Sequence, residues 1–259
     1  MILHHHEAGD PNAPAMIALH GLLGSSRNWR GAARFLAEQF RMITLDARNH
    51  GESFHTSTNT FDDMVQDLQE LMDHLGLDTA TLVGHSMGGK VAMAFACRYP
   101  ERVERLFVVD TAPKDYPPYH EAEFAAMNAL DLSSLQNRSD ADAFIADYID
   151  DWAFRQFLIS NIVRGEDRSF KWLINLPVIE AHLGLLAKNA LDLMDTYEGP
   201  AHFLIGGQSK YVTESDHTDI RYHFPDVTIE TWGDSGHNPH FEHRDRFVEW
   251  VLQKVGGQF

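Results

Sequence analysis

Several absences narrow the classes to which this sequence can belong. Its 259 residues include one cysteine, Cys97, so no disulfide can form within the chain. No apolar run reaches the roughly 18 residues that a membrane-spanning helix needs. The first residues, 1–6, have neither the basic start nor the long apolar segment of a signal peptide. These features predict a globular protein of the reducing cytoplasm.

Basic residues are scarce beside acidic ones. The chain has 21 Lys and Arg against 38 Asp and Glu, which gives a formal net charge of −17. Such an excess repels nucleic acid and anionic membrane surfaces, so we expect neither as a partner. It also repels polyanions, which weakens, without excluding, an acyl-CoA substrate. With 44% hydrophobic residues, the chain can form one large domain or one domain with an insertion.

The strongest local signal is the stretch Gly84-His85-Ser86-Met87-Gly88. An apolar, β-rich run precedes it, and the small and apolar residues 91–96 that follow predict a buried helix. A serine on a sharp strand-to-helix turn brings the backbones two residues before and after it together, so glycine is favoured at both places. The helix behind Ser86 directs its first amides toward the position of an oxyanion. This pattern indicates a nucleophile elbow rather than a structural turn.

Strands and helices alternate through most of the chain. This rhythm predicts an α/β fold with a mainly parallel central sheet and helices on both faces. We expect strands at residues 1–7, 16–19, 41–45, 79–84, 106–109, 201–205 and 227–232, and helices at 29–40, 61–75, 91–96, 214–223 and 244–255.

The rhythm is interrupted between residues 113 and 196. This part contains no convincing strand and three helical stretches, at 122–132, 140–163 and 170–193. We therefore predict a core made of residues 1–112 and 197–259, with an all-helical lid inserted at 113–196 over the carboxyl edge of the sheet.

A serine hydroxyl becomes a nucleophile only with a base within hydrogen-bond reach, and that base is oriented by an acid. In elbow enzymes the chain order is Ser, then acid, then His. The base is thus expected after the last strand, where His237 ends the loop Gly233-Asp234-Ser235-Gly236-His237. We select His237 as the base.

Four segments, each at the end of a predicted strand, together resemble the α/β-hydrolase family, and within it the small bacterial esterases of the YbfF type. They are His20-Gly21-Leu22-Leu23-Gly24-Ser25, Asp46-Ala47-Arg48-Asn49-His50-Gly51-Glu52-Ser53, Gly84-His85-Ser86-Met87-Gly88-Gly89-Lys90 and Asp110-Thr111-Ala112-Pro113. The resemblance covers nearly the whole chain. It implies a Ser86 nucleophile, no cofactor or metal, and an oxyanion hole made by the backbone N–H groups of Leu22 and Met87.

The acid departs from the commonest family pattern. Most members carry Asp or Glu after the penultimate strand, where this chain has Ser209, and a hydroxyl cannot stabilise an imidazolium as a carboxylate does. The YbfF-like proteins resemble a variant with the acid one strand earlier, which matches Asp110. Ser209 is then expected to hydrogen-bond Asp110 or His237. Three carboxylates remain as alternative acids: Glu214, Asp216 and Asp234.

These features predict a serine hydrolase, a carboxylesterase or acyl thioesterase, that cleaves small esters through an acyl-enzyme. His20 and His85 flank the site, and we expect them to support its loops. A compact pocket under the insertion predicts a preference for short acyl chains. A carbon–carbon bond hydrolase or a cofactor-free perhydrolase would use the same side chains, and a ligand-binding receptor can retain the fold without turnover. The oligomeric state stays open.

Overall fold

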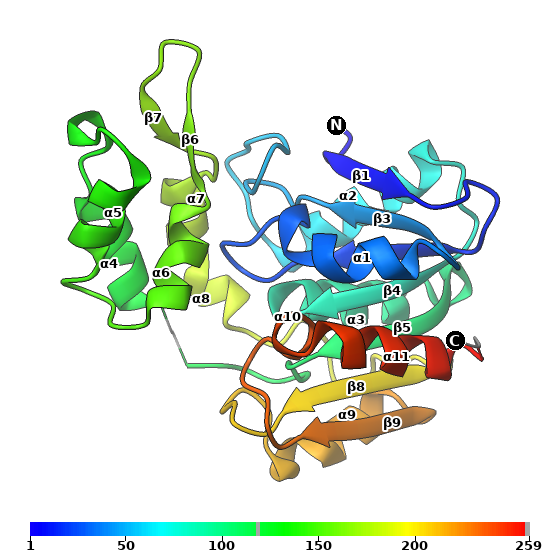
Figure 1. Ribbon diagram of the computed structural model, residues 1–259. Coiled ribbons are helices and arrows are strands. Elements are labelled where there is room, and N and C mark those ends of the chain that lie inside the picture. Colours follow the sequence, from blue (N-terminus) through cyan, green and yellow to red (C-terminus); the bar gives the residue numbers. More distant parts are fainter. Residues whose placement is uncertain (118–119, 257–259) are drawn as a thin grey trace.

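A computed structural model describes residues 1–117 and 120–256, and a seven-stranded sheet is its centre (Figure 1). The strand order is β1-β3-β2-β4-β5-β8-β9, in which β1 is antiparallel to β3 and the other neighbours are parallel. The predicted parallel sheet is therefore confirmed. The strands are β1 (His5–Ala8), β2 (Ala15–Leu19), β3 (Arg41–Leu45), β4 (Ala80–His85), β5 (Val103–Val109), β8 (Ala201–Gly206) and β9 (Val227–Trp232).

Helices cover both faces of this sheet, as predicted (Figure 1). Helices α1 and α11 lie on one face, and α2, α3 and α9 lie on the other. The short helix α10 precedes α11. Their bounds are α1 (Arg30–Leu36), α2 (Phe61–His74), α3 (Met87–Arg98), α9 (His217–His223), α10 (Pro239–Glu242) and α11 (Arg244–Lys254).

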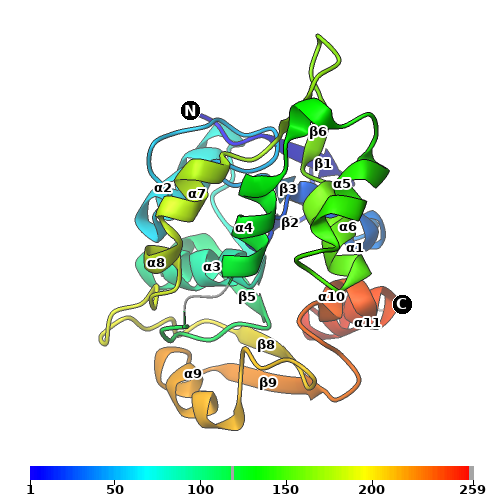
Figure 2. The same ribbon diagram turned by 90° about the vertical axis from the view of Figure 1, so that its left-hand side faces the viewer.

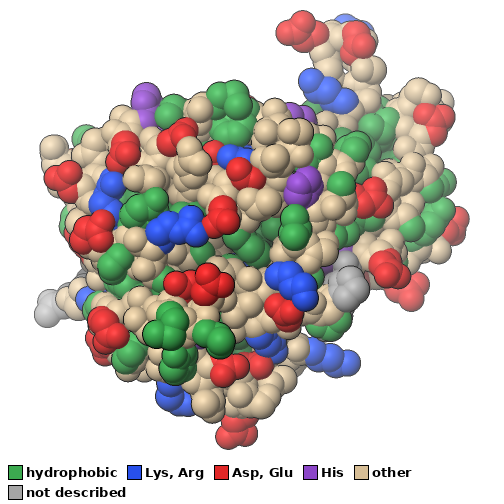
Figure 3. Space-filling view, turned by 180° about the vertical axis from the view of Figure 1, so that it is seen from behind, with side chains coloured by type: hydrophobic (Ala, Val, Ile, Leu, Met, Phe, Trp, Pro, Cys, Tyr) green, Lys and Arg blue, Asp and Glu red, His purple; other side chains and the backbone are tan. Residues whose placement is uncertain are grey.

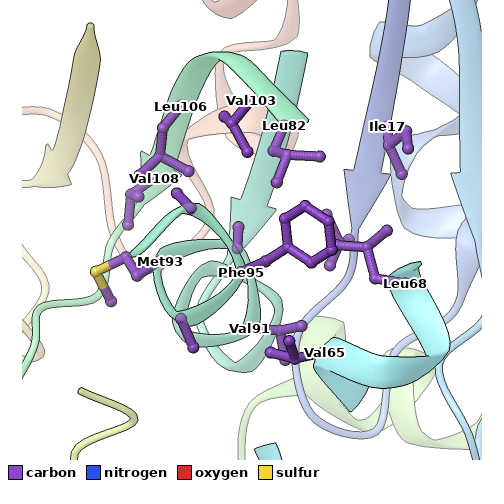
Figure 4. Close-up of a cluster of buried hydrophobic side chains, with 14 of the residues drawn as sticks. Ile17, Val65, Leu68, Leu82, Val91, Met93, Phe95, Val103, Leu106 and Val108 are labelled. Carbon is purple, nitrogen blue, oxygen red and sulfur yellow. The ribbon is translucent and has the colours of Figure 1, made fainter. Parts of the chain in front are cut away.

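The larger hydrophobic core surrounds α3 (Figure 4). Phe95 of this helix is fully buried between Leu68 of α2 and the sheet residue Leu82. Because α3 has apolar or small side chains on nearly every face, it packs against two layers at once. This burial fixes the helix whose first residue follows Ser86.

Residues 113–196, which we call the insertion, leave the sheet after β5 and return to it at the neighbouring strand β8. They stand beside the carboxyl ends of the strands (Figures 1 and 2). A separate hydrophobic core joins residues of the insertion such as Phe124, Ile145 and Ile179 to Leu23 of the loop after β2. Its helices are α4 (Glu121–Ala129), α5 (Arg138–Ile145), α6 (Trp152–Ile159), α7 (Leu176–Ala181) and α8 (Leu183–Leu186).

The insertion is not all-helical, which corrects the expectation from the sequence. Strands β6 (Ile162–Arg164) and β7 (Phe170–Trp172) form an antiparallel hairpin that projects from the molecule (Figures 1 and 3). The hairpin turn is stabilised locally, because Asp167 Oδ1 accepts hydrogen bonds from the N–H and Oγ of Ser169. Such a three-residue strand is too short to give a clear period in the sequence.

Candidate active site

The turn from β4 to α3 places Ser86 in an uncommon backbone conformation, with φ 50° and ψ −117°. A Cβ on Gly84 would lie 2.3 Å from the carbonyl oxygen of Gly88, and a Cβ on Gly88 would lie 2.4 Å from that of Leu19. Neither distance is compatible with a side chain. The two glycines are thus required by the close backbone approach that the sequence predicted, and the turn presents Ser86 at the carboxyl edge of the sheet.

Asp110 and His237 meet at the same edge, although 127 positions separate them. Asp110 follows β5, is fully buried, and accepts a 2.7 Å hydrogen bond from His237 Nδ1 at its Oδ2. The same oxygen accepts from Ser209 Oγ at 2.5 Å, and Oδ1 accepts from the backbone N–H of Gly206 at 3.0 Å. Three donors therefore surround this buried carboxyl group.

The alternative acids have other partners. Asp216 forms an ion pair with Lys114 Nζ at 2.5 Å, and this ammonium, together with hydrogen bonds from Thr213, holds the pKa of Asp216 below its usual value against the effect of burial. Asp234 pairs with Arg246 at 3.0 Å, and Glu214 is exposed. The structure thus brings together His237 and Asp110, with Ser209 against Asp110, as the sequence predicted.

The loop that carries Leu22 is held by two buried histidines. His20 Nε2 accepts from the N–H of Ala47 at 3.0 Å, so its Nδ1 is the nitrogen that donates to the Gly21 carbonyl. His50 Nε2 likewise accepts from the N–H of Leu23 at 3.3 Å. Desolvation lowers the pKa of both residues, to about 3 for His50. The neutral imidazoles thus support the loop, as expected for His20.

A row of aromatic rings packs against His237, and one of them is stacked on it. The ring of Tyr211 lies parallel to the imidazole of His237, with 3.9 Å between centroids. His85 lies 4.6 Å from His237 and also 4.6 Å from His240, which in turn packs on Trp29 at 4.4 Å. His85 Nε2 is 2.9 Å from the carbonyl oxygen of His237. Burial lowers the pKa of His85 and, to about 3, that of His240, which keeps both rings uncharged beside His237.

Ser86 lines a pocket between the sheet edge and the insertion. Its wall is mostly apolar. Leu22, Ser86, Met87, Lys90 and Thr111 line it from the sheet side; Tyr116, Pro117, His120, Leu183, Leu186 and Ala187 line it from the insertion, and Tyr211 completes it. Both residues expected to supply the oxyanion hole, Leu22 and Met87, thus border the same space as Ser86.

Three residues of this region were missed by sequence reasoning. Tyr211 and His240 gave no such signal, because Tyr211 stacks on His237 and His240 packs on His85 from loops whose positions depend on the whole fold. Lys90 did give one: it is a single charged residue in the otherwise small and apolar stretch from Met87 to Ala96. It is only 3% exposed.

Within residues 1–117 and 120–256, no three His, Cys, Asp or Glu side chains form a cluster that could hold a metal ion. In the same ranges, every helix is too short or too polar to cross a bilayer.

Known proteins similar to this chain share its whole architecture. A family model described as the alpha/beta hydrolase fold matches residues 14–244. The chain is 39% identical to the sn-1-specific diacylglycerol lipase ABHD11 of Mus musculus over 94% of its length and 81% of that protein. It is 34% identical to Esterase YbfF of Escherichia coli, over 93% and 92% of the two chains. A solved structure, a marine microorganism esterase, superposes with a TM-score of 0.95 at 33% identity and covers 98% of this chain and 99% of its own. The resemblance seen in the four motifs is confirmed, and the chain belongs to the α/β-hydrolase family.

Proposed function

We propose that the protein is a serine carboxylesterase in which Ser86, His237 and Asp110 form the catalytic triad. Ser86 Oγ attacks the acyl carbonyl while His237 Nε2 takes its proton, and the N–H groups of Leu22 and Met87 stabilise the oxyanion. His237 then returns the proton to the departing alcohol, which leaves an acyl-enzyme. Water, deprotonated by His237, attacks the ester of Ser86 and releases the carboxylic acid.

The observation that supports this proposal most is the hydrogen bond between His237 Nδ1 and Oδ2 of the buried Asp110. An ionised carboxylate accepts hydrogen bonds and cannot donate them, so Nδ1 must carry the proton. The lone pair of the neutral ring is then on Nε2, as a general base requires. The buried charge of Asp110 would also stabilise the imidazolium that forms during each step.

The pocket and the relatives support a small ester as the substrate. The wall around Ser86 is mostly apolar and is closed on one side by the insertion, so we propose that residues 113–196 act as a lid and that short acyl chains fit best. The relatives described above are two esterases and a diacylglycerol lipase. Thioesters with a small, uncharged leaving group fit the same chemistry.

A covalent probe and an ester series test this function. Wild type should react with a fluorophosphonate and hydrolyse p-nitrophenyl esters from C2 to C16 with a short-chain optimum, and Ser86→Ala should do neither. Asp110→Asn should lower kcat by about 10⁴, because the imidazole loses its orienting charge. Asp216→Asn, which changes a carboxylate outside the site, is the control and should leave turnover largely intact. A labelled but inactive wild type, or a loss confined to Asp216→Asn, would contradict the proposed triad.

A second function is favoured by one comparison. The mouse relative, 39% identical, is named a diacylglycerol lipase, so an acylglycerol is a candidate substrate for this chain also. A diacylglycerol with two medium-length chains should be compared with a p-nitrophenyl ester of the same acyl group. A higher kcat/KM for the diacylglycerol would favour the lipase function, and a lower one the esterase.

We further propose the cytoplasm as the compartment. The only cysteine, Cys97, lies in α3, and burial raises the pKa of its thiol to about 12. A thiol of that kind is a poor nucleophile and neither needs nor forms a disulfide. Fractionation of cells that express the protein would test this placement.

A further inference from the structure

Lys90 is a buried cation beside the nucleophile. It lies one turn after Ser86 in α3, where its backbone N–H donates to the Ser86 carbonyl at 3.1 Å. Its side chain lines the pocket into which Ser86 opens, although only 3% of the residue is exposed. An ammonium this deeply buried is costly unless its hydrogen bonds are satisfied. Its partners therefore indicate what it does.

The partners of Lys90 are three consecutive carbonyl groups at the end of α8. Its Nζ donates to the oxygens of Leu186, at 3.3 Å, Ala187, at 3.4 Å, and Lys188. The last carbonyls of a helix have no partner within the helix, and a cation is favoured at that end. The rings of Tyr116 and Phe61 lie against the same ammonium, 4.8 and 5.3 Å from their centroids. All three N–H bonds of the ammonium thus point at one short segment of the insertion.

The residues held in this way form the wall of the acyl pocket. Leu186 and Ala187 line the pocket directly, and Leu183 stands one turn before them. The chain that leaves β5 joins the same place, because the N–H of Tyr116 donates to the Ala187 carbonyl at 2.7 Å. Lys90 therefore connects the last part of the insertion to α3, the helix that follows Ser86. Through the hydrogen bond between Ala187 and Tyr116, it also holds the first part of the insertion.

The geometry points to Lys90 as a specificity-determining residue: its ammonium fixes the wall of Leu183, Leu186 and Ala187 at a set distance from Ser86 and so limits the length of the acyl group. This inference rests on the proposed esterase function. Without the ammonium, the carbonyls of Leu186 and Lys188 lose their donor and gain by turning to water, while that of Ala187 keeps only the N–H of Tyr116. The wall then moves away from Ser86, and longer acyl chains fit.

The insertion should stay folded when this tie is removed. Its hydrophobic core consists of insertion residues together with Leu23 from the loop after β2. It is also bound to the loops of the sheet elsewhere, where Asn161 Nδ2 donates to the Leu23 carbonyl at 2.8 Å and the N–H of Asn175 to the Asn49 carbonyl at 2.8 Å. A Lys90 variant therefore tests the position of the wall rather than the presence of the insertion.

The first experiment compares Lys90→Met with Lys188→Met. Methionine keeps the apolar stem and removes the ammonium; Lys188 is in the same segment, but its side chain is 66% exposed and pairs with Asp115. The readout is kcat/KM for the C8 p-nitrophenyl ester divided by kcat/KM for the C4 ester. A change in the ionisation of the triad alters both values equally and leaves this ratio unchanged. Lys90→Met should raise this ratio about tenfold or more, while Lys188→Met should leave it at the wild-type value. An active Lys90→Met enzyme with the wild-type ratio would overturn the inference.

A second experiment uses the wild-type protein and does not depend on any variant folding. Ser86 is first blocked with a fluorophosphonate that carries either a methyl or an octyl chain, and the lysines are then labelled with an amine-reactive reagent. Burial lowers the pKa of Lys90 to about 8, which by itself would speed its labelling. Slow labelling therefore indicates that the amine stays bound to the carbonyls of residues 186–188. In the methyl adduct, we expect Lys90 to be labelled more slowly than Lys188. In the octyl adduct, where the longer chain displaces the wall, Lys90 should be labelled faster than in the methyl adduct. Equal labelling of Lys90 in both adducts would overturn the inference, whereas failure of Ser86 to react at all would instead contradict the proposed function.

Discussion

Ser209 occupies the position at which most α/β-hydrolases carry their acid, yet it remains connected to the site. Its hydroxyl donates to Asp110 Oδ2, the oxygen that also accepts from His237. Hydrogen bonds to charged groups contribute about 1.5–3 kcal/mol. We therefore expect Ser209→Ala to lower kcat by roughly 10- to 100-fold with little change in KM, because the carboxylate loses a donor that fixes its orientation.

Steady-state kinetics on a C4 ester would measure this effect. Ser215→Ala is the matched control, since Ser215 Oγ contacts Thr213 on the exposed surface. Equal kcat for Ser209→Ala and wild type would show that Asp110 needs only the Gly206 amide and His237.

His240 makes the free energy of unfolding depend on pH. Its Nδ1 is buried with no hydrogen-bond partner among the described residues, and desolvation lowers its pKa to about 3. Between the ordinary value of 6.5 and about 3, the unfolded state binds one more proton at this residue than the folded state does. This contribution to the free energy of unfolding is complete above pH ~6.5 and falls by about 1.4 kcal/mol per pH unit as the pH decreases.

His240→Phe keeps a ring between Trp29 and His85 and removes the titrating nitrogen. Urea unfolding at several pH values between 7 and 4 should therefore show a shallower loss of stability for the variant than for wild type. Parallel curves would contradict a lowered pKa of His240 in the folded protein.

The contacts around His237 show which part of the site the sequence could reveal. Ser86 and His237 follow from a motif and from chain order, because the elbow glycines and the position after the last strand are local facts. Asp110 came from the family resemblance, since the residues alone left Asp216 and others open. The stacking of Tyr211 and the binding of Lys90 to backbone carbonyls depend on loops that meet only in the folded chain.

At the scale of elements, Gly88 of the elbow and Gly184 of α8 should respond in opposite ways to substitution by alanine. A Cβ at Gly88 would lie 2.4 Å from the Leu19 carbonyl oxygen and 2.6 Å from that of His20, both backbone atoms that cannot turn aside. A Cβ at Gly184, in the short helix α8, would meet nothing within 4 Å. Gly88→Ala should thus cost about 1–3 kcal/mol or more, while Gly184→Ala should stabilise by roughly 0.5–1 kcal/mol.

Thermal unfolding of both variants measures this difference, and fluorophosphonate labelling shows whether Ser86 is still presented. A Gly88→Ala protein as stable and as reactive as wild type would contradict the close approach of the elbow to β2.

The same scale explains which elements could be predicted. Strands β3 and β9 match their predicted bounds, because each is an apolar or alternating run between clear turn signals. The expected helix at 140–163 is instead α5 and α6, separated where Asp151 accepts a hydrogen bond from the N–H of Phe154 and so begins α6. An aspartate that caps a helix can be recognised in a sequence. Here the apolar residues on both sides of Asp151 have helical spacing, so a single continuous helix was predicted.

At the scale of the whole molecule, the charge of −17 should govern which thioesters the enzyme can use. Lys90 lines the pocket but is buried, and the two exposed or half-buried lysines of the insertion are neutralised, because Lys114 pairs with Asp216 and Lys188 pairs with Asp115. Acidic side chains are also spread over the surface shown in Figure 3. A polyanionic leaving group such as CoA is therefore repelled as it approaches, whereas a neutral one is not.

Salt separates this long-range repulsion from contacts within the pocket. Raising the ionic strength from about 0.01 M to about 0.15 M shortens the Debye length from about 30 Å to about 8 Å. We expect kcat/KM for butyryl-CoA to increase several-fold over this range, while kcat/KM for the N-acetylcysteamine thioester of the same acid stays constant, because both share the acyl group and Ser86 chemistry. A decrease with salt for the CoA ester would instead require an attractive basic surface at the pocket mouth. The preference for small, uncharged leaving groups would then have to come from the shape of the pocket and not from the field of the protein.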